Sequence, residues 1–254
     1  MSRTLQRCTV RSCGEIADNT FLLRFHSPEI ASAAAPGQFV NIRVEGPILR
    51  RPFSISRIEG ANLELIFHAI GGGTTYLSRR KGGEVLDVIG PLGQPFRTEG
   101  TFDTALIVAG GIGVAPFPFL TNELHKKKKN IETFLGFRTA AQICSGHLNN
   151  VHLATDDGSA GVHGTVLVPL QSYLDQHGTQ SVKIFGCGPT VMLKALGTLA
   201  RQRKICCELS LEGQMACGVG ICQGCPVERT DGTPKYALVC KDGPVFPAEE
   251  VLLP

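Results

Sequence analysis

The sequence predicts an α+β protein of three domains: an N-terminal antiparallel β-barrel, a central doubly wound α/β domain and a small C-terminal domain. Short β-branched runs separated by Pro and Gly fill residues 1–98. Apolar strands alternate with helical segments over residues 101–205. Residues 206–254 carry a cluster of cysteines and little apolar bulk, so we expect a metal centre to stabilise the fold of this domain. We take these three ranges as the predicted domains.

The composition is that of a globular protein and excludes several functional classes. Of 254 residues, 43% are hydrophobic and 19% are charged, so disorder is not expected. A net charge of +3 is too small for a nucleic-acid or membrane-surface footprint. The first ten residues lack a signal-peptide core, and the uncharged apolar stretch 105–120 is too short and too broken by Gly and Pro to span a bilayer. We therefore expect a cytoplasmic protein with reduced thiols, no nucleic-acid partner and no membrane span.

The first range, residues 1–98, is rich in strand-forming runs that are separated by turn signals. Pro36-Gly37 and Gly90-Pro91 are typical of such turns. The predicted strands lie at 7–11, 20–26, 39–44, 62–69 and 84–89, with a short helical segment at 75–81. This spacing predicts a small barrel or sandwich.

Three segments of this range carry residues that suit a flat, phosphate-bearing cofactor. Arg51-Pro52-Phe53-Ser54 combines a fixed cation, a rigid proline, an aromatic plane and a hydroxyl. Ile66-Phe67-His68 adds a strand edge, and Gly73-Thr74 adds a backbone-plus-hydroxyl site for a phosphate. Taken alone, these segments also fit an ordinary strand and turn.

The second range, residues 101–205, has the rhythm of a parallel sheet with helical crossovers. The predicted strands lie at 104–109, 132–136, 151–154 and 181–185, and the predicted helices at 115–129 and 191–202, with the segment 166–176 before the fourth strand. Because parallel strands end at one edge of such a sheet, the loops that follow them are expected to gather there and to bind a ligand.

Two of these loops are rich in glycine. Gly110-Gly111-Ile112-Gly113 lies between a strand and a helix, where glycines let the backbone approach a pyrophosphate. The third glycine of the dinucleotide-binding fingerprint is missing, and a purely structural turn is the alternative. Gly186-Cys187-Gly188-Pro189 also joins a strand to a helix, so Cys187 could approach a nicotinamide ring or could simply be a small residue in a tight turn.

The residues that would contact the nucleotide ribose are not decided by the sequence. Arg138 follows the second strand and could bind a 2′-phosphate, although an exposed loop arginine is the commoner explanation. Asp156 and Asp157 end the third strand, where they could face a ligand or cap a turn. The choice between NAD and NADP therefore stays open at this point.

Four cysteines near the C-terminus have the spacing C-x4-C-x2-C-x14-C: Cys217, Cys222, Cys225 and Cys240. The first three are packed into nine residues, and glycines between them let the backbone bend around the sulfurs. This triplet has the plant-type ferredoxin spacing for a [2Fe–2S] cluster. Structural zinc usually takes two separated C-x2-C pairs, and here Cys240 stands alone. We therefore predict a [2Fe–2S] cluster, with zinc or unligated thiols as alternatives.

The sequence resembles the ferredoxin-reductase superfamily over essentially its whole length. The resemblance is carried by four motifs in the same order along the chain: R-P-F-S, G-T, G-G-I-G-V-A-P and G-C-G-P. Residues 210–225, SLEGQMACGVGICQGC, further resemble the electron-transfer subunits of class 1B dihydroorotate dehydrogenases, iron–sulfur flavoproteins of pyrimidine biosynthesis. The short gap before Cys240 favours this family over hydroxylase reductases, whose separate ferredoxin domain has a longer last gap.

The resemblance implies three bound groups. It implies FAD in the barrel, with contacts from Arg51, Pro52, Phe53, Ser54, Ile66, Phe67, His68, Gly73 and Thr74. It implies NAD at the second domain, through Gly110, Gly111, Gly113, Gly186, Gly188 and Pro189, with Cys187 near the nicotinamide. It implies that Cys217, Cys222, Cys225 and Cys240 hold the [2Fe–2S] cluster. The family often has Arg where His68 stands, and many superfamily members have Tyr where Phe53 stands.

The same resemblance implies a catalytic partner subunit that carries FMN and oxidises dihydroorotate, in a heterotetramer of two chains of each kind. Nicotinamide exchanges two electrons as a hydride, a [2Fe–2S] cluster accepts one, and a flavin does both. Electrons are thus expected to run from the partner through the cluster and FAD to NAD+. Alternatives are a similar subunit of a hydrogenase, a glutamate-synthase-like enzyme or a transhydrogenase, a zinc-stabilised nucleotide-binding regulator without redox activity, and an assembly scaffold.

Overall fold

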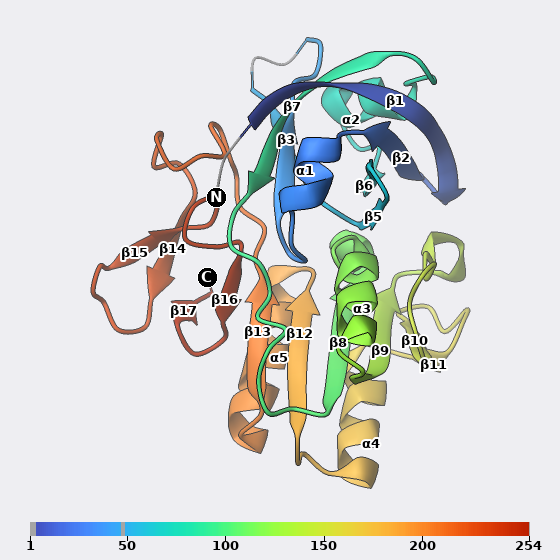
Figure 1. Ribbon diagram of the computed structural model, residues 1–254. Coiled ribbons are helices and arrows are strands. Elements are labelled where there is room, and N and C mark those ends of the chain that lie inside the picture. The colour runs from blue at the N-terminus through green and yellow to red at the C-terminus, as the bar shows by residue number, and fades with distance from the viewer. Residues whose placement is uncertain (1–3, 47–48, 254) are drawn as a thin grey trace.

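The N-terminal strands form one antiparallel sheet of seven, in the order β4-β3-β7-β1-β2-β6-β5. The computed structural model describes residues 4–46 and 49–253 (Figure 1). The strands are β1 (Thr4–Ala17), β2 (Thr20–His26), β3 (Phe39–Ile42), β4 (Arg51–Ser54), β5 (Arg57–Glu59), β6 (Asn62–His68) and β7 (Val85–Leu92). β4 also packs against β6, so the sheet curls into a barrel around buried residues such as Leu23, Phe25 and Leu65. Two short helices, α1 (Pro28–Ala33) and α2 (Gly72–Ser78), pack on these strands.

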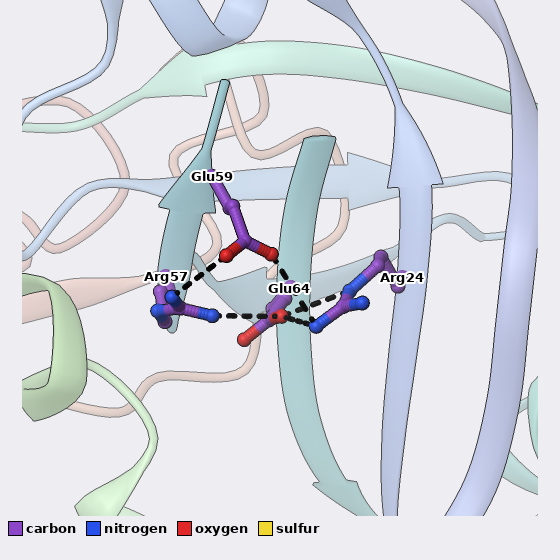
Figure 2. A network of polar contacts seen from close by, with 4 residues as sticks. All are labelled: Arg24, Arg57, Glu59 and Glu64. Carbon is purple, nitrogen blue, oxygen red and sulfur yellow. Dashed lines mark hydrogen bonds and ion pairs between the residues drawn. The ribbon is translucent and has the colours of Figure 1, made fainter. Parts of the chain in front are cut away.

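A buried carboxylate fixes one wall of the barrel (Figure 2). Glu64 of β6 accepts hydrogen bonds from Arg24 of β2 at 2.9 Å and from Arg57 of β5 at 3.3 Å. Glu59 contacts the same Arg57 guanidinium at 3.1 Å. The network joins three neighbouring strands and satisfies a charge that burial would otherwise destabilise. Side chains alternate along a strand, so Ile66 lies on the same face of β6 as Glu64.

The central sheet is parallel and is covered by helices on both faces. Its order is β11-β10-β9-β8-β12-β13-β16, and only β16 runs antiparallel, against β13. The elements are β8 (Thr104–Gly110), η1 (Gly111–Val114), α3 (Phe117–Lys126), β9 (Asn130–Phe137), η2 (Ala140–Gln142), β10 (Val151–Thr155), β11 (Val162–His163), α4 (Leu167–His177), β12 (Val182–Cys187), α5 (Thr190–Arg203), β13 (Cys206–Ser210) and β16 (Val245–Pro247).

Alternate residues of β8 serve the two faces of this sheet. Ile107 packs in one apolar cluster with Phe117 of α3, whereas Leu106 packs in another with Leu170 of α4 and Leu193 of α5. The predicted doubly wound arrangement is confirmed. The helix predicted over 115–129 is shorter than expected, because 3-10 helix η1 precedes it and the backbone leaves the helix at its C-terminal end.

The C-terminal residues form loops and a small sheet with the order β15-β14-β17. Its strands are β14 (Pro226–Arg229), β15 (Tyr236–Leu238) and β17 (Val251–Leu252). Strand pairing places residues 206–210 and 245–247 in the central sheet, although the predicted third domain included them. The division into units at 98/101 and 205/206 stays a prediction. Among the described residues, no helix is long and apolar enough to cross a membrane.

Candidate functional site

A cavity of about 270 Å³ lies where the barrel, the central sheet and the C-terminal segment meet. Seven residues predicted to bind a flavin line it: Pro52, Phe53, Ser54, Ile66, Phe67, His68 and Thr74. Other walls come from distant segments, with Phe39 from β3, Pro116 before α3, and Met215 from the C-terminal segment. The apolar planes, together with the hydroxyls of Ser54, Thr74 and Ser210, suit a flat ring system that needs few polar contacts. These residues fit an isoalloxazine.

Arg51 and Gly73, the other two predicted flavin contacts, lie beside this cavity and do not line it. The Arg51 guanidinium donates to the Leu49 carbonyl oxygen at 3.0 Å. A Cβ on Gly73 would lie 3.4 Å from Arg51 Cγ, so α2 packs closely on the arginine side chain. The two segments predicted to hold phosphate therefore touch each other at the cavity edge.

A larger cavity, about 630 Å³, opens at the carboxyl edge of the central sheet. Five residues of the predicted nucleotide site line it: Gly110, Gly111, Gly113, Gly188 and Pro189. Arg138 and Asp156, which follow β9 and β10, line it as well. This is the edge at which doubly wound folds bind nucleotides.

The two glycine-rich turns of this cavity are packed backbone to backbone. A Cβ on Gly113 would lie 2.4 Å from the Cys187 carbonyl oxygen, so only glycine fits. Gly186 lines neither cavity, and a Cβ there would meet Leu196 at 2.6 Å and Leu209 at 2.8 Å. Close packing against α5 and β13 therefore explains why residue 186 is a glycine.

Cys187 lines the flavin cavity and does not line the nucleotide cavity. Its side chain is buried, and burial, followed by the nearby Glu212 carboxylate, raises its pKa to about 12. The thiol is therefore protonated at neutral pH and offers a small neutral surface to the flavin cavity.

The two cavities are neighbours, because four residues line both: His68, Ile70, Ile112 and Glu212. A ring bound in one cavity can therefore contact a ring bound in the other. Burial lowers the pKa of His68, so its imidazole is neutral at pH 7. Partial desolvation at the cavity walls raises the pKa of Glu212, which lines both cavities while keeping an exposed surface.

The four C-terminal thiols are arranged in two pairs. Cys217 Sγ accepts a hydrogen bond from the backbone N–H of Cys222 at 3.4 Å, and Cys225 Sγ accepts one from the backbone N–H of Cys240 at 3.4 Å. Burial raises the pKa of Cys217, but the backbone donors, Cys222 first among them, outweigh it and lower the pKa to about 6. The backbone N–H groups that stabilise the Cys217 thiolate can donate in the same way to a metal-bound sulfur.

This pairing fits a two-iron cluster, in which each iron takes two protein thiolates. Across residues 4–46 and 49–253, no group of three or more His, Cys, Asp or Glu side chains is placed to hold a metal ion. The C-x4-C-x2-C-x14-C spacing and the pairing of the thiols fit the predicted [2Fe–2S] cluster.

Sequence reasoning missed several residues that line these cavities, Phe39, Ile70, Glu212 and Met215 among them. Phe39 and Ile70 belong to no recognisable motif, whereas Glu212 and Met215 lie in the segment 210–225 that contains the first three cluster cysteines. The fold brings these residues to the cavities from β3, from the loop after β6 and from the segment after β13.

Comparison with known proteins decides the family. Residues 212–252 match the model of the iron–sulfur cluster binding domain of dihydroorotate dehydrogenase B. The chain is 39% identical to the dihydroorotate dehydrogenase B (NAD(+)) electron transfer subunit of Desulforamulus reducens, over 93% of this chain and 94% of that protein. It is 38% identical to the subunit of the same name from Geobacillus thermodenitrificans, over 98% of each chain. The chain belongs to the family of dihydroorotate dehydrogenase B electron transfer subunits.

Solved structures support the same fold for this family member. A chain of an NADH-dependent reduced ferredoxin-NADP oxidoreductase superposes with a TM-score of 0.87 and 30% identity, over 97% of this chain and 90% of the other. Phthalate dioxygenase reductase superposes with a TM-score of 0.64 over 93% of this chain and 94% of the other, and at 13% identity it supports the fold alone. The resemblance to this family predicted from sequence is confirmed.

Proposed function

We propose that this chain is an oxidoreductase subunit that relays electrons from a catalytic dihydroorotate dehydrogenase through a [2Fe–2S] cluster and FAD to NAD+, in pyrimidine biosynthesis. The observation that carries the proposal is the order of the three sites. The nucleotide cavity shares four lining residues with the flavin cavity, and Met215 of the flavin cavity lies two residues before Cys217. When bound, the flavin supplies the exchange between single electrons and a hydride.

The residues of the chain bind and orient the three groups. Pro52, Phe53 and Phe67 supply apolar surface for the flavin ring, Ser54 supplies a hydroxyl, and Arg51 with the Gly73-Thr74 turn serves the phosphates. The glycine-rich turns before η1 and α5 leave backbone room for the NAD pyrophosphate. Cys187 lines the flavin cavity with a neutral thiol. Cys217, Cys222, Cys225 and Cys240 hold the cluster.

The partner follows from the family name. Relatives named as electron transfer subunits of dihydroorotate dehydrogenase B support a catalytic subunit as the partner, and we infer that this subunit carries FMN, that two chains of each kind assemble, and that the complex works in the cytoplasm. The cluster loop is the expected contact, because Ile221 between the first two cysteines is 81% exposed.

A reconstitution tests the proposal. The chain, co-expressed with the dihydroorotate dehydrogenase of the same cell, is expected to co-purify with it and to carry iron, acid-labile sulfide and FAD. Dihydroorotate should then reduce the bound flavin and form NADH. A partner that oxidises dihydroorotate without reducing this flavin contradicts the assigned donor. A colourless preparation that contains zinc and no iron would instead support the non-redox regulator.

A second candidate acceptor, NADP+, rests on one observation. Arg138 lines the nucleotide cavity, where its guanidinium could bind a 2′-phosphate. The structural relative with the TM-score of 0.87 is named for NADP as well as NADH. Flavin reduction by NADH and by NADPH, compared at equal concentration, decides between them, and a preference for NADPH would replace NAD+ by NADP+ as the proposed acceptor.

A further inference from the structure

Strand β3 faces both the flavin cavity and the cluster loop. Val40 and Ile42 belong to the barrel core, so alternation along the strand turns Phe39 and Asn41 outward. Phe39 lines the flavin cavity and packs in the same apolar cluster as Cys225. Asn41, the next outward residue, is 1% exposed. An uncharged polar side chain is thus buried beside the contact between the flavin wall and the cluster segment.

Asn41 holds the first cysteine of the cluster loop. Its Nδ2 donates a hydrogen bond to the Cys217 carbonyl oxygen at 3.1 Å. A Cβ on Gly218 would lie 2.5 Å from the same nitrogen, so the loop rests on the amide without space between them. The Cys217 thiol accepts from the backbone of its own loop, from Val219 and Cys222, while its carbonyl points to the barrel.

The other polar atom of this amide has no partner. Asn41 Oδ1 is buried and accepts no hydrogen bond within the part of the chain that the structure describes. An unpaired buried acceptor destabilises a protein, and an apolar residue of the same size would avoid that cost. The presence of an amide side chain at this position is therefore explained by its Nδ2 donor, which bonds to the Cys217 carbonyl oxygen.

The segment between the two redox sites is short and is held at both ends. Met215 lines the flavin cavity, and Cys217 follows it by two residues. The hydrogen bond from Asn41 fixes the Cys217 end of this segment to the strand whose Phe39 forms a wall of the same cavity. The separation of the cluster from the flavin is thereby set by one strand and three loop residues.

We propose that Asn41 is a positioning residue for electron transfer between the cluster and the flavin. Its amide ties Cys217 to β3, so the two redox groups keep a fixed separation. The step that it serves moves one electron between the two groups, and no bond in the chain forms or breaks. The inference rests on the proposed function, because it requires both groups to be bound.

The test compares full-length holoprotein with Asn41→Leu, which keeps the size and removes the donor, and with Asn41→Asp, which replaces the donor by an acceptor. Thr121→Val is the matched control, because Thr121 is also a buried polar residue with an unpaired oxygen but lies on α3. After mixing with NADH under anaerobic conditions, stopped-flow absorbance follows reduction of the flavin and then of the cluster. Iron, sulfide and FAD contents and the midpoint potential of the cluster are measured on the same samples.

We expect the ratio of the cluster-reduction rate to the flavin-reduction rate to fall roughly two- to tenfold in Asn41→Leu, the range that corresponds to one net hydrogen bond. The control should keep the ratio of the unmodified protein. Asn41→Asp should also lower the cluster potential, because it places negative charge beside Cys217. Because that charge alone shifts the potential, the ratio in Asn41→Leu, which adds no charge, is the readout that separates positioning from electrostatics.

Each outcome decides between distinct claims. An unchanged ratio in Asn41→Leu with full iron and flavin overturns the inference. If Asn41→Leu does not retain iron, Asn41→Asp is decisive, and an unchanged ratio and potential in that variant overturn it equally. Lack of iron or FAD in the unmodified protein contradicts the proposed function itself and is seen before any variant is compared.

Discussion

A buried ion pair between two strands of the central sheet gives a stability prediction that can be worked from the structure. Lys183 of β12 and Glu208 of β13 lie 3.1 Å apart, with side chains 7% and 3% exposed. Lys183 also donates to the Arg97 carbonyl oxygen at 2.7 Å, and Glu208 accepts from the Arg97 backbone N–H at 2.9 Å. The pair thus joins two central strands to the segment that leaves the barrel. β13 continues from Glu208 into Ser210, a wall of the flavin cavity.

Lys183→Met is expected to destabilise the protein by about 3 kcal/mol, the lower end of the range for breaking a buried ion pair. We take the lower end because Glu208 keeps the Arg97 backbone N–H and has the Arg97 guanidinium 3.8 Å away. For a chain of this size that corresponds to a melting temperature lower by roughly 6–12 °C. Urea unfolding followed by far-UV circular dichroism, together with calorimetry, measures both quantities.

The double variant Lys183→Met/Glu208→Leu should recover most of the loss, since an apolar pair leaves no buried charge. Lys194→Met, which removes an exposed lysine of α5, is the control and should change stability by less than about 0.5 kcal/mol. If Lys183→Met costs no more than this control, or if the double variant is less stable than the single one, the pair is not desolvated as described and the reasoning fails.

Three further predictions concern the sites. Gly113→Ala places a Cβ 2.4 Å from the Cys187 carbonyl oxygen, so the KM for NADH should rise about tenfold while flavin content is retained, as steady-state dye reduction will show. Cys222→Ser should lose iron and acid-labile sulfide but keep NADH-dependent flavin reduction, whereas Cys206→Ser, at another exposed cysteine, should keep all three. Burial raises the pKa of Glu212, so its ionised form destabilises the flavin-free protein above the unfolded-state pKa. Glu212→Gln should therefore raise the urea midpoint at neutral pH, and the gain should vanish as the pH falls to about 4.

The parts of the site that sequence predicts well are those in which the ligands are neighbours in the chain. Three cluster cysteines lie within nine residues, and the Arg51-Pro52-Phe53-Ser54 motif lies on one strand, so spacing alone indicates their chemistry. Asn41 has no such neighbours. Asn41 reaches the cluster through a contact with a residue 176 positions away, which no local pattern encodes.

The same reason explains why composition alone does not place the residues that follow α5. Residues 206–210 come after a helix and begin with two cysteines, so composition groups them with the cysteine-rich tail. They form β13, which pairs in parallel with β12 and is buried over most of its length. The assignment of this strand to the central sheet depends on its pairing with residues more than twenty positions earlier in the chain.

The placement of β13 also explains why one small chain can connect three redox groups. β12 and β13 end side by side, with Cys187 paired to Ser210, and both residues line the flavin cavity. From Ser210 the chain needs only seven more residues to reach Cys217, where Asn41 of the barrel holds it. The flavin wall is therefore built from the barrel, the nucleotide-binding sheet and the cluster segment together. A cofactor bound there stabilises the contacts among all three, because a ligand that binds only the folded state adds its binding free energy to that state.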